Sequence, residues 1–250
     1  MAKRKSESYE LYYWPGIPGR GEFVRLVFED AGAPYVDVGR LSESEGGGMS
    51  AVRRLLEGEL GGVVPFAPPA VKFGEHVVAQ TPLLGHILGC RFGLAPPDDA
   101  GRTAALQHAM TLADFVVEAH DVHHPLGASL YYEDQKPEAA RRAQVFRDER
   151  MAEFLGYFER VLEQNRAGDG QVLVGDRVTY VDLYAFQVLE GLGYAFPNAY
   201  GRRAHDFPRL NALRSRVAER PRLGAYLASD RRTPFNERGI FRHYPELDPA

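Results

Sequence analysis

Hydrophobic and polar residues alternate near the start of the chain with the period of two that is typical of a β-strand. Tyr9, Leu11 and Tyr13 fall on one face, and Glu10, Tyr12 and Trp14 fall on the other. A loop rich in glycine and proline follows, and apolar residues then recur at helical spacing from Phe23 to Val27, ending near Gly32. The apolar run at 33–38 predicts a second strand. This β-α-β order favours two parallel strands.

The pattern is weaker in the next segment, 39–62, where only 50–57 indicates a short helix. Residues 70–78 predict a β-hairpin that turns at Gly74, because two apolar runs flank a glycine there. Residues 81–92 then predict a helix. The first part of the chain is therefore expected to be a small sheet with helices.

The segment Gly93-Leu-Ala-Pro-Pro-Asp-Asp is typical of a linker, because two adjacent prolines cannot continue a helix. Asp98 or Asp99 is suited to cap the helix that follows. Beyond this point only helical stripes recur, first Leu106, Met110, Ala113 and Val117, and then Met151, Phe154, Leu155, Phe158 and Leu162. Further helices are predicted over 179–192 and 207–227.

These elements predict a fold of class α/β plus all-α with two domains. Residues 8–93 match a thioredoxin-like domain, and residues 99–236 form an all-helical bundle. The segments 1–7 and 237–250 are expected to be tails.

Composition agrees with a globular protein of this size. The chain has 250 residues, against roughly 150 for an average domain. Hydrophobic residues make up 44% and charged residues 26%, which excludes wholesale disorder. A formal net charge of -4 gives no general attraction to nucleic acid or to an anionic membrane. No apolar run approaches the roughly 18 residues that a membrane-spanning helix needs. The charged start of the chain is not followed by the apolar segment of a signal peptide. A single cysteine forbids an internal disulfide. These features predict a cytoplasmic protein.

Four stretches, in this order and spacing, resemble the tyrosine-type cytosolic glutathione transferases (alpha, mu, pi and sigma classes). They are Tyr12-Tyr13-Trp14-Pro15 with Gly19-Arg20-Gly21, then 69–81, then the capping segment 175–182, and finally 207–210 with 219–227. The resemblance runs from about Tyr9 to Asn236. It implies that glutathione is a cosubstrate, that no organic cofactor or metal is bound, and that the protein is a homodimer.

Tyr13 is the candidate catalytic residue. A thiol with a pKa near 8.5 is mostly protonated at neutral pH, and a hydroxyl that donates to sulfur favours the reactive thiolate. Lowering the pKa by about two units requires roughly 2.7 kcal/mol, which is within the effect of one preorganised donor. A packed core tyrosine is the alternative interpretation. Tyr12 points to the opposite face of the strand and is the weaker candidate.

Gln80-Thr81-Pro82 has features of a helix start, since proline is preferred in the first turn and threonine is a good cap. Free N–H groups at such an end hold carboxylates. The resemblance implies that Gln80 and Thr81 bind the γ-glutamyl carboxylate of glutathione, with Arg20 nearby. An ordinary capped helix explains Thr81 equally well but leaves Gln80 without a role.

The resemblance also implies a cis-proline whose preceding residue pairs through its backbone with glutathione. Spacing to Gly74 and Gln80 favours Pro69, but the preceding residue is then Pro68, which has no N–H. One backbone contact is therefore expected to be weakened or replaced. Trp14 completes the expected glutathione site, together with Asp114, which would act across a dimer interface. The residues for the glycyl carboxylate stay open, with Arg53 and Arg54 as candidates.

The electrophile pocket is expected to include Ile17, His120 and His124, with Trp14, Pro18 and Phe235 as further walls. His120 and His124 have the spacing of metal ligands on a helix, but no cysteine or His-Glu-x-x-His motif accompanies them. No metal site is predicted. Cys90 is expected to be a buried structural thiol, and Thr179 with Asp182 a capping pair.

The sequence thus predicts a glutathione transferase that conjugates the thiolate to small, largely apolar electrophiles. A glutathione-dependent peroxidase or isomerase using the same thiolate is an alternative within the enzymes. A non-catalytic glutathione- or ligand-binding protein of the same fold is the alternative from another class. The identity of the electrophile is not encoded in any recognisable motif.

Overall fold

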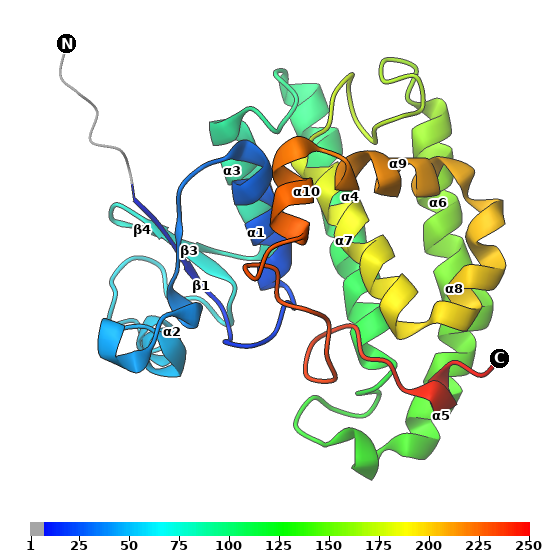
Figure 1. Ribbon diagram of the computed structural model, residues 1–250, viewed down its shortest axis with the longest axis horizontal. Coiled ribbons are helices and arrows are strands. Elements are labelled where there is room, and N and C mark those ends of the chain that lie inside the picture. Colours follow the sequence, from blue (N-terminus) through cyan, green and yellow to red (C-terminus); the bar gives the residue numbers. More distant parts are fainter. Residues whose placement is uncertain (1–7) are drawn as a thin grey trace.

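The computed structural model describes residues 8–250, so the predicted tail 1–7 lies outside the described residues. Figure 1 shows a small sheet with its helices on one side and a larger group of helices on the other. In the first half, the elements are β1 (Tyr9–Tyr12), α1 (Gly21–Ala31), β2 (Val36–Asp37), α2 (Gly48–Leu56), β3 (Ala70–Phe73), β4 (His76–Ala79) and α3 (Thr81–Phe92). The strand order is β2-β1-β3-β4.

The sheet combines one parallel pair with two antiparallel pairs. β1 and β2 run parallel, as the β-α-β pattern predicts, and Leu11 lies opposite Asp37. β1 and β3 are antiparallel, with Leu11 opposite Val71, and β3 and β4 form the predicted hairpin. β2 is only two residues long, although the apolar run at 33–38 predicts a longer strand. Pro34 interrupts that run, and proline cannot donate to a strand ladder.

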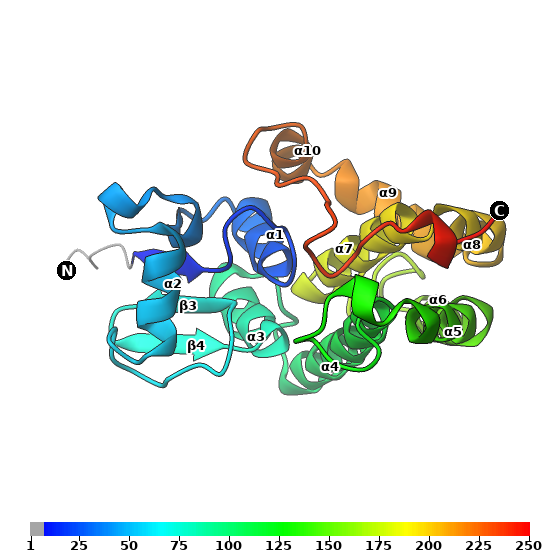
Figure 2. The ribbon, with the colours of Figure 1, turned by 90° about the horizontal axis from the view of Figure 1, so that it is seen from below.

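Helix α1 is buried on every side over Gly21–Asp30. It contacts α3 on one side and α7 and α10 on the other, so it lies between the sheet and the helical half (Figure 2). Its apolar residues, including Phe23 and Phe28, pack into one hydrophobic core that continues into the helical half. The first residues of α1 are consequently held in place from both halves of the chain.

The second half consists of helices packed around α7 (Figures 1 and 2). The α-helices are α4 (Asp99–Asp121), α5 (Lys136–Val145), α6 (Met151–Gln164), α7 (Tyr180–Ala195), α8 (Pro197–Arg203), α9 (Pro208–Ala218) and α10 (Pro221–Leu227). Asp98 caps α4 by accepting a hydrogen bond from the N–H of Gly101 over 2.8 Å. The predicted capping pair is present at α7, where Asp182 accepts from the N–H of Thr179 over 2.7 Å.

Three features of the helical half differ from the sequence pattern. The run 207–227 is two helices, because Pro221 starts a new one after Ala218. α5 and α8 are absent from the prediction, since their apolar stripes are short. Residues 237–250, expected as a tail, pack on the helical half, with Ile240, Phe241 and Leu247 buried. Between residues 8 and 250, no helix is long and apolar enough to cross a membrane.

The two halves meet along α1, α3, α4 and α7. Tyr184 on α7 donates a hydrogen bond to the carbonyl of Thr81 at the start of α3, over 2.7 Å. The N–H of Tyr180 donates to the carbonyl of Leu94 in the linker, over 2.8 Å. The division at 93–99 into separate domains stays a prediction, and what the structure shows is a shared core across it.

Candidate functional site

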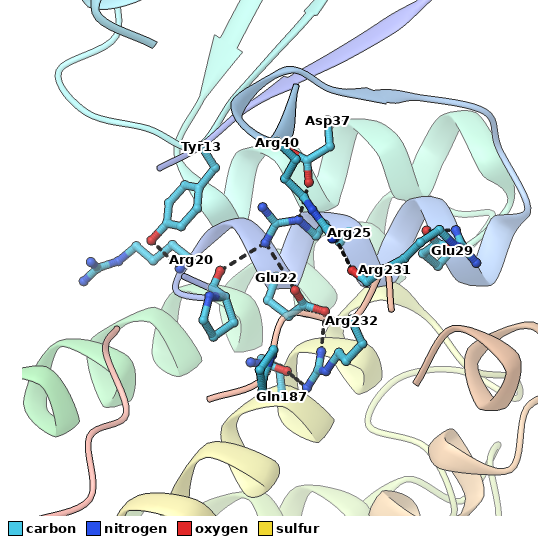
Figure 3. Close-up of polar contacts among 12 residues, drawn as sticks. Tyr13, Arg20, Glu22, Arg25, Glu29, Asp37, Arg40, Gln187, Arg231 and Arg232 are labelled. Carbon is cyan, nitrogen blue, oxygen red and sulfur yellow. Dashed lines mark hydrogen bonds and ion pairs between the residues drawn. The ribbon is translucent and has the colours of Figure 1, made fainter. Parts of the chain in front are cut away.

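Tyr13 follows β1 directly and turns its side chain toward the start of α1. Its hydroxyl oxygen accepts a hydrogen bond from the N–H of Arg20 over 2.8 Å (Figure 3). The residue is 4% exposed. Within the described residues the hydroxyl accepts this hydrogen bond and donates none, so the phenolic proton is available to a ligand.

Two glycines allow the backbone to approach the phenol closely. A Cβ atom on Gly21 would lie 2.5 Å from Cγ of Tyr13, and one on Gly19 would overlap the phenolic oxygen. Gly19 also adopts φ +42°, a conformation that residues with side chains rarely take. The glycine-rich loop is therefore shaped around the Tyr13 ring.

Burial has the largest effect on the pKa of Tyr13. Burial raises the pKa of the hydroxyl from 10.0, while the N–H of Arg20 and the positive charges of Arg20 and Arg25 act in the opposite direction. Tyr13 is therefore protonated at neutral pH. A protonated phenol whose oxygen already accepts an N–H bond acts as a hydrogen-bond donor.

A cavity of about 350 Å³ lies between the starts of α1 and α3 and the middle of α4. Its walls are Arg20, Phe23, Phe66, Ala67, Pro68, Pro69, Gln80, Thr81, Pro82, Ala109, Leu112, Ala113, Val116, Val117 and Tyr184. Arg20, Gln80 and Thr81 bring the polar groups, and α4 brings an apolar wall. Tyr13 is not part of the wall; it lies behind Arg20, whose N–H it accepts.

The start of α3 brings a polar group without a partner into this cavity. Thr81 is 9% exposed, and its Oγ1 has no hydrogen-bond partner among the described residues. The preceding Gln80 has φ 71°, so the chain turns sharply into the helix there. A carboxylate fits such a helix end, because free N–H groups, the helix dipole and the hydroxyl all favour negative charge.

The cis peptide bond lies between Pro68 and Pro69, as the spacing predicts. Both prolines line the cavity beside Ala67. Pro68 has no N–H, so its backbone offers a ligand only a carbonyl group. Any amide of a ligand at this point can donate to Pro68 but cannot accept from it.

A family model described as "Glutathione S-transferase, C-terminal domain" matches residues 120–230. Glutathione S-transferase P 2 of Bufo bufo is 28% identical over 233 residues, covering 92% of this chain and 98% of its own. The chain is therefore similar to glutathione S-transferases over nearly its whole length, and part of its helical half matches the model of their C-terminal domain. S-crystallin 4 of Enteroctopus dofleini is 26% identical over 234 residues, covering 91% and 99% of the two chains.

Solved glutathione S-transferases share the fold. The structure of the Onchocerca volvulus pi-class enzyme has a TM-score of 0.66 at 20% identity, over 88% of this chain and 91% of that one. A nematode-specific glutathione S-transferase of C. elegans also has a TM-score of 0.66, at 23% identity, over 92% of this chain and all of that one. The thioredoxin-like part followed by a helical part is therefore the fold of the family, as the sequence predicts.

Several predicted transferase residues lie apart from the cavity. Asp114 is exposed on α4, and Trp14 and Ile17 are half-buried in the loop after β1. Arg53 and Arg54 are exposed on α2, where Arg54 forms an ion pair with Glu59 over 3.2 Å. Their roles toward glutathione stay predictions. The expectation that Cys90 is buried is wrong, because its side chain is exposed on α3.

The three histidines after the middle of α4 pack against one another. α4 ends at Asp121, so His120 and His124 are not a pair on one helix, although their rings are 5.1 Å apart. His123 is buried, its Nε2 lies 2.7 Å from the carbonyl of Ile240, and burial lowers its pKa to about 3. Burial also lowers the pKa of His120, and the nearby Arg20 charge acts in the same direction. Across the described ranges, no group of three or more His, Cys, Asp or Glu is arranged to hold a metal ion.

Arg25 is a residue near Tyr13 that sequence reasoning missed. It is 1% exposed, and its guanidinium carbon lies 5.8 Å from the centre of the Tyr13 ring. The available signal was a charged residue between Val24 and Leu26 in a helix that is apolar on both sides. Such a residue is rarely buried unless it is paired.

Proposed function

We propose that this protein binds glutathione in the cavity and transfers its thiolate to small electrophiles. The γ-glutamyl carboxylate would lie at the start of α3, against Gln80 and the unpartnered Oγ1 of Thr81. The sulfur would lie beside the hydroxyl of Tyr13. The observation that carries the proposal is the combination of a protonated donor, Tyr13, bonded to Arg20 of the cavity wall, with a helix start shaped for a carboxylate in the same wall.

Tyr13 would act on the ionisation of the thiol. The thiol proton is lost to solvent, and the O–H of Tyr13 keeps its own proton and donates a hydrogen bond to the sulfur, which stabilises the thiolate over the thiol. The N–H of Arg20 donates to the phenolic oxygen, which leaves the O–H of Tyr13 to donate to the sulfur. The backbone at Gly19 and Gly21 packs closely against the Tyr13 ring and holds it in place. Little reorganisation is therefore needed when the thiolate forms.

The electrophile would enter on the apolar side of the cavity. Leu112, Val116 and Val117 of α4 supply apolar surface there. His120 lies one turn further along α4 and near the charge of Arg20. In the reaction a carbon–sulfur bond forms, and the leaving group departs with the electron pair of the broken bond. When the electrophile is a strained ring that opens or an alkene that adds the sulfur, no group leaves, and the product takes up a proton from solvent.

A second copy of the chain is part of the proposal. Two exposed apolar side chains line the cavity, Phe66 and Val117, and Val63 and Met110 are exposed a few residues from them in sequence. Exposed apolar residues that gather on a surface mark interaction sites. Asp114 lies between Met110 and Val117 and would then face the partner. The proposed compartment is the cytoplasm, since a single cysteine allows no internal disulfide.

A second candidate is a non-catalytic protein of the same fold. Pro68 favours it, because a ligand amide that elsewhere finds a backbone N–H finds none here. An S-crystallin is among the relatives that match nearly full length. The retained donor geometry at Tyr13 favours the enzyme.

Calorimetric titration with glutathione, followed by a conjugation assay with an activated aryl chloride, separates the two. The proposal predicts glutathione binding and conjugation above the uncatalysed rate. S-Methylglutathione should compete for binding but should not react. A protein that fails to bind glutathione at millimolar concentration contradicts the proposal, and one that binds without accelerating conjugation supports the second candidate.

A further inference from the structure

Arg25 lies at the centre of a buried polar cluster behind the proposed thiol site. Its Nε donates to Oδ2 of Asp37 over 2.7 Å, and its Nη1 donates to Oε2 of Glu22 over 3.2 Å. Arg25 and Glu22 are 1% and 0% exposed. A guanidinium suits this place, because it stays charged and its planar fork contacts several acceptors at once.

The same guanidinium reaches the loop that surrounds Tyr13. Nη1 also contacts the carbonyl of Pro18 over 3.3 Å, immediately before the close approach of Gly19 to the phenol. The guanidinium carbon lies within 5.8 Å of the Tyr13 ring centre (Figure 3). One buried cation therefore contacts both the ring and the backbone that shapes its surroundings.

The cluster is anchored from the C-terminal half. Oε1 of Glu22 accepts from the hydroxyl of Tyr226 on α10 over 2.6 Å, and it also accepts from Arg232. Arg232 in turn donates to Oε1 of Gln187 on α7 over 2.9 Å. Glu22 thus ties Arg25 to α7 and α10, so the position of the loop depends on segments more than 150 residues away in sequence.

The charged and titratable groups facing Arg25 come from each element packed on it. They are Glu22 on its own helix, Asp37 on β2, Tyr226 on α10, Tyr35 before β2 and Tyr13 after β1. The negative charges of Glu22 and Asp37 equal the positive charges of Arg25 and Arg232, so the net charge of the cluster is zero. Removing Arg25 leaves an excess of negative charge behind the phenol.

We propose that Arg25 is a positioning residue for thiol activation: it holds the Pro18 carbonyl and supplies the positive charge behind Tyr13 that keeps its hydroxyl a strong donor. This inference rests on the proposed function of Tyr13. Arg25 itself does not line the cavity, so its role would not require contact with the substrate. Its effect passes through the ring and the loop, because the field of a buried charge is only weakly screened.

The test measures the ionisation of glutathione bound to Arg25→Met, by the ultraviolet absorbance of the thiolate against pH. The thiol pKa is expected to rise by about one unit, and kcat below that pKa is expected to fall about tenfold. The KM for glutathione should change little, because Gln80 and Thr81 are untouched. A purely structural role would lower the folded fraction and leave the thiol pKa of the folded enzyme unchanged, which would overturn the proposal.

Arg220→Met is the matched control. Arg220 also joins α10 to α1, through Asp30 at the last turn of α1 over 2.8 Å, but it does not reach the loop or the phenol. The thiol pKa of glutathione bound to Arg220→Met should equal that of glutathione bound to the wild type. A similar rise in both variants would contradict a specific role for Arg25.

Two further measurements complete the design. If Arg25→Met does not fold, Arg25→Gln is measured, which removes the charge but keeps a polar side chain that can donate a hydrogen bond. A rise in thiol pKa at unchanged KM then supports the proposal, and an unchanged thiol pKa overturns it. The wild type is measured first: a wild type that leaves the thiol pKa of glutathione unshifted contradicts the proposed function itself, whereas a shifted wild type with an unshifted Arg25 variant contradicts only the role of Arg25.

Discussion

The N–H of Arg20 donates to the hydroxyl oxygen of Tyr13 over 2.8 Å, at the point where the chain enters α1. This contact uses one lone pair of the phenol and leaves its proton directed elsewhere. Because Arg20 also lines the cavity, the same residue connects the buried donor to the space where a ligand would lie.

Tyr13→Phe is expected to shift the pH profile of conjugation to higher pH. Burial raises the pKa of Tyr13 above 10.0, so in the wild type the hydroxyl stays a donor throughout the working range and only the thiol titrates. Without the donor the thiol pKa rises by about two units, and the rate at pH 6.5 falls about a hundredfold. Rates from pH 5.5 to 9.5 check this. Profiles that superimpose would remove Tyr13 from the reaction.

Gly21→Ala should impair activity by displacing the phenol. The added Cβ would lie 2.5 Å from Cγ of Tyr13, which is an atom near the backbone and has little freedom to move. We expect conjugation to fall by at least about tenfold, while glutathione affinity changes less. Gly156→Ala on α6 is the control, since its Cβ would find its nearest atom at 3.5 Å. Equal activities for the two variants would contradict the account of the loop.

Thr81→Val should weaken glutathione binding without weakening the fold. Oγ1 of Thr81 has no partner among residues 8–250, so the isosteric change removes a ligand contact but no internal hydrogen bond. A lost hydrogen bond to a charged group corresponds to about a tenfold loss of affinity. Calorimetry and thermal unfolding measure the two effects. Thr103→Val, on exposed α4 surface, should leave affinity unchanged; an unchanged affinity in Thr81→Val would place the carboxylate elsewhere.

Phe66→Ser should dissociate the proposed homodimer. The side chain is 98% exposed beside other apolar residues, an arrangement that water disfavours unless a partner covers it. Sedimentation velocity should show a dimer for the wild type and a larger monomer fraction for the variant. Leu126→Ser, 62% exposed in the loop after α4, is expected to keep the wild-type state. A wild type that sediments as a monomer at all concentrations would contradict the proposed dimer.

Asp182→Asn should change how stability depends on pH. Burial raises the pKa of Asp182 to about 6, above the 3.8 of the unfolded chain, so the folded state binds the proton more tightly between these values. The contribution of Asp182 to the free energy of unfolding is therefore largest below pH 3.8 and declines as pH rises through about 6, by about 3 kcal/mol in all.

Urea unfolding of wild type and Asp182→Asn at pH 5 and pH 7 measures this contribution. The wild type should lose more stability than the variant between the two pH values. Asp176→Asn, at an exposed position in the turn before α7, should behave as the wild type. Equal losses in wild type and Asp182→Asn would show that Asp182 has no raised pKa.

Local patterns carried most of the fold prediction. The alternation at 9–13, the hairpin around Gly74 and the helix after Gln80 depend on neighbouring residues, and each is present. The capping pair of Thr179 and Asp182 is equally local. The packing of 237–250 was missed because the burial of Ile240 and Leu247 depends on helices far away in sequence.

In the candidate site, too, the features that depend on neighbouring residues could be predicted, and those that depend on distant residues could not. The cis bond before Pro69 and the helix start at Thr81 follow from spacing and residue type. The role of Arg25 does not, because its acceptors Pro18, Glu22 and Asp37 meet only in the folded chain. Periodicity shows that Arg25 lies between apolar residues of a helix, but it does not show which groups Arg25 contacts.

The central claim is that the hydroxyl of Tyr13 donates a hydrogen bond to the sulfur of bound glutathione. A crystal structure of the glutathione complex tests it most directly. The account predicts that the sulfur lies within hydrogen-bonding distance of the Tyr13 hydroxyl, with the γ-glutamyl carboxylate at Gln80 and Thr81. A sulfur held by another donor, with Tyr13 still buried behind Arg20, would contradict it.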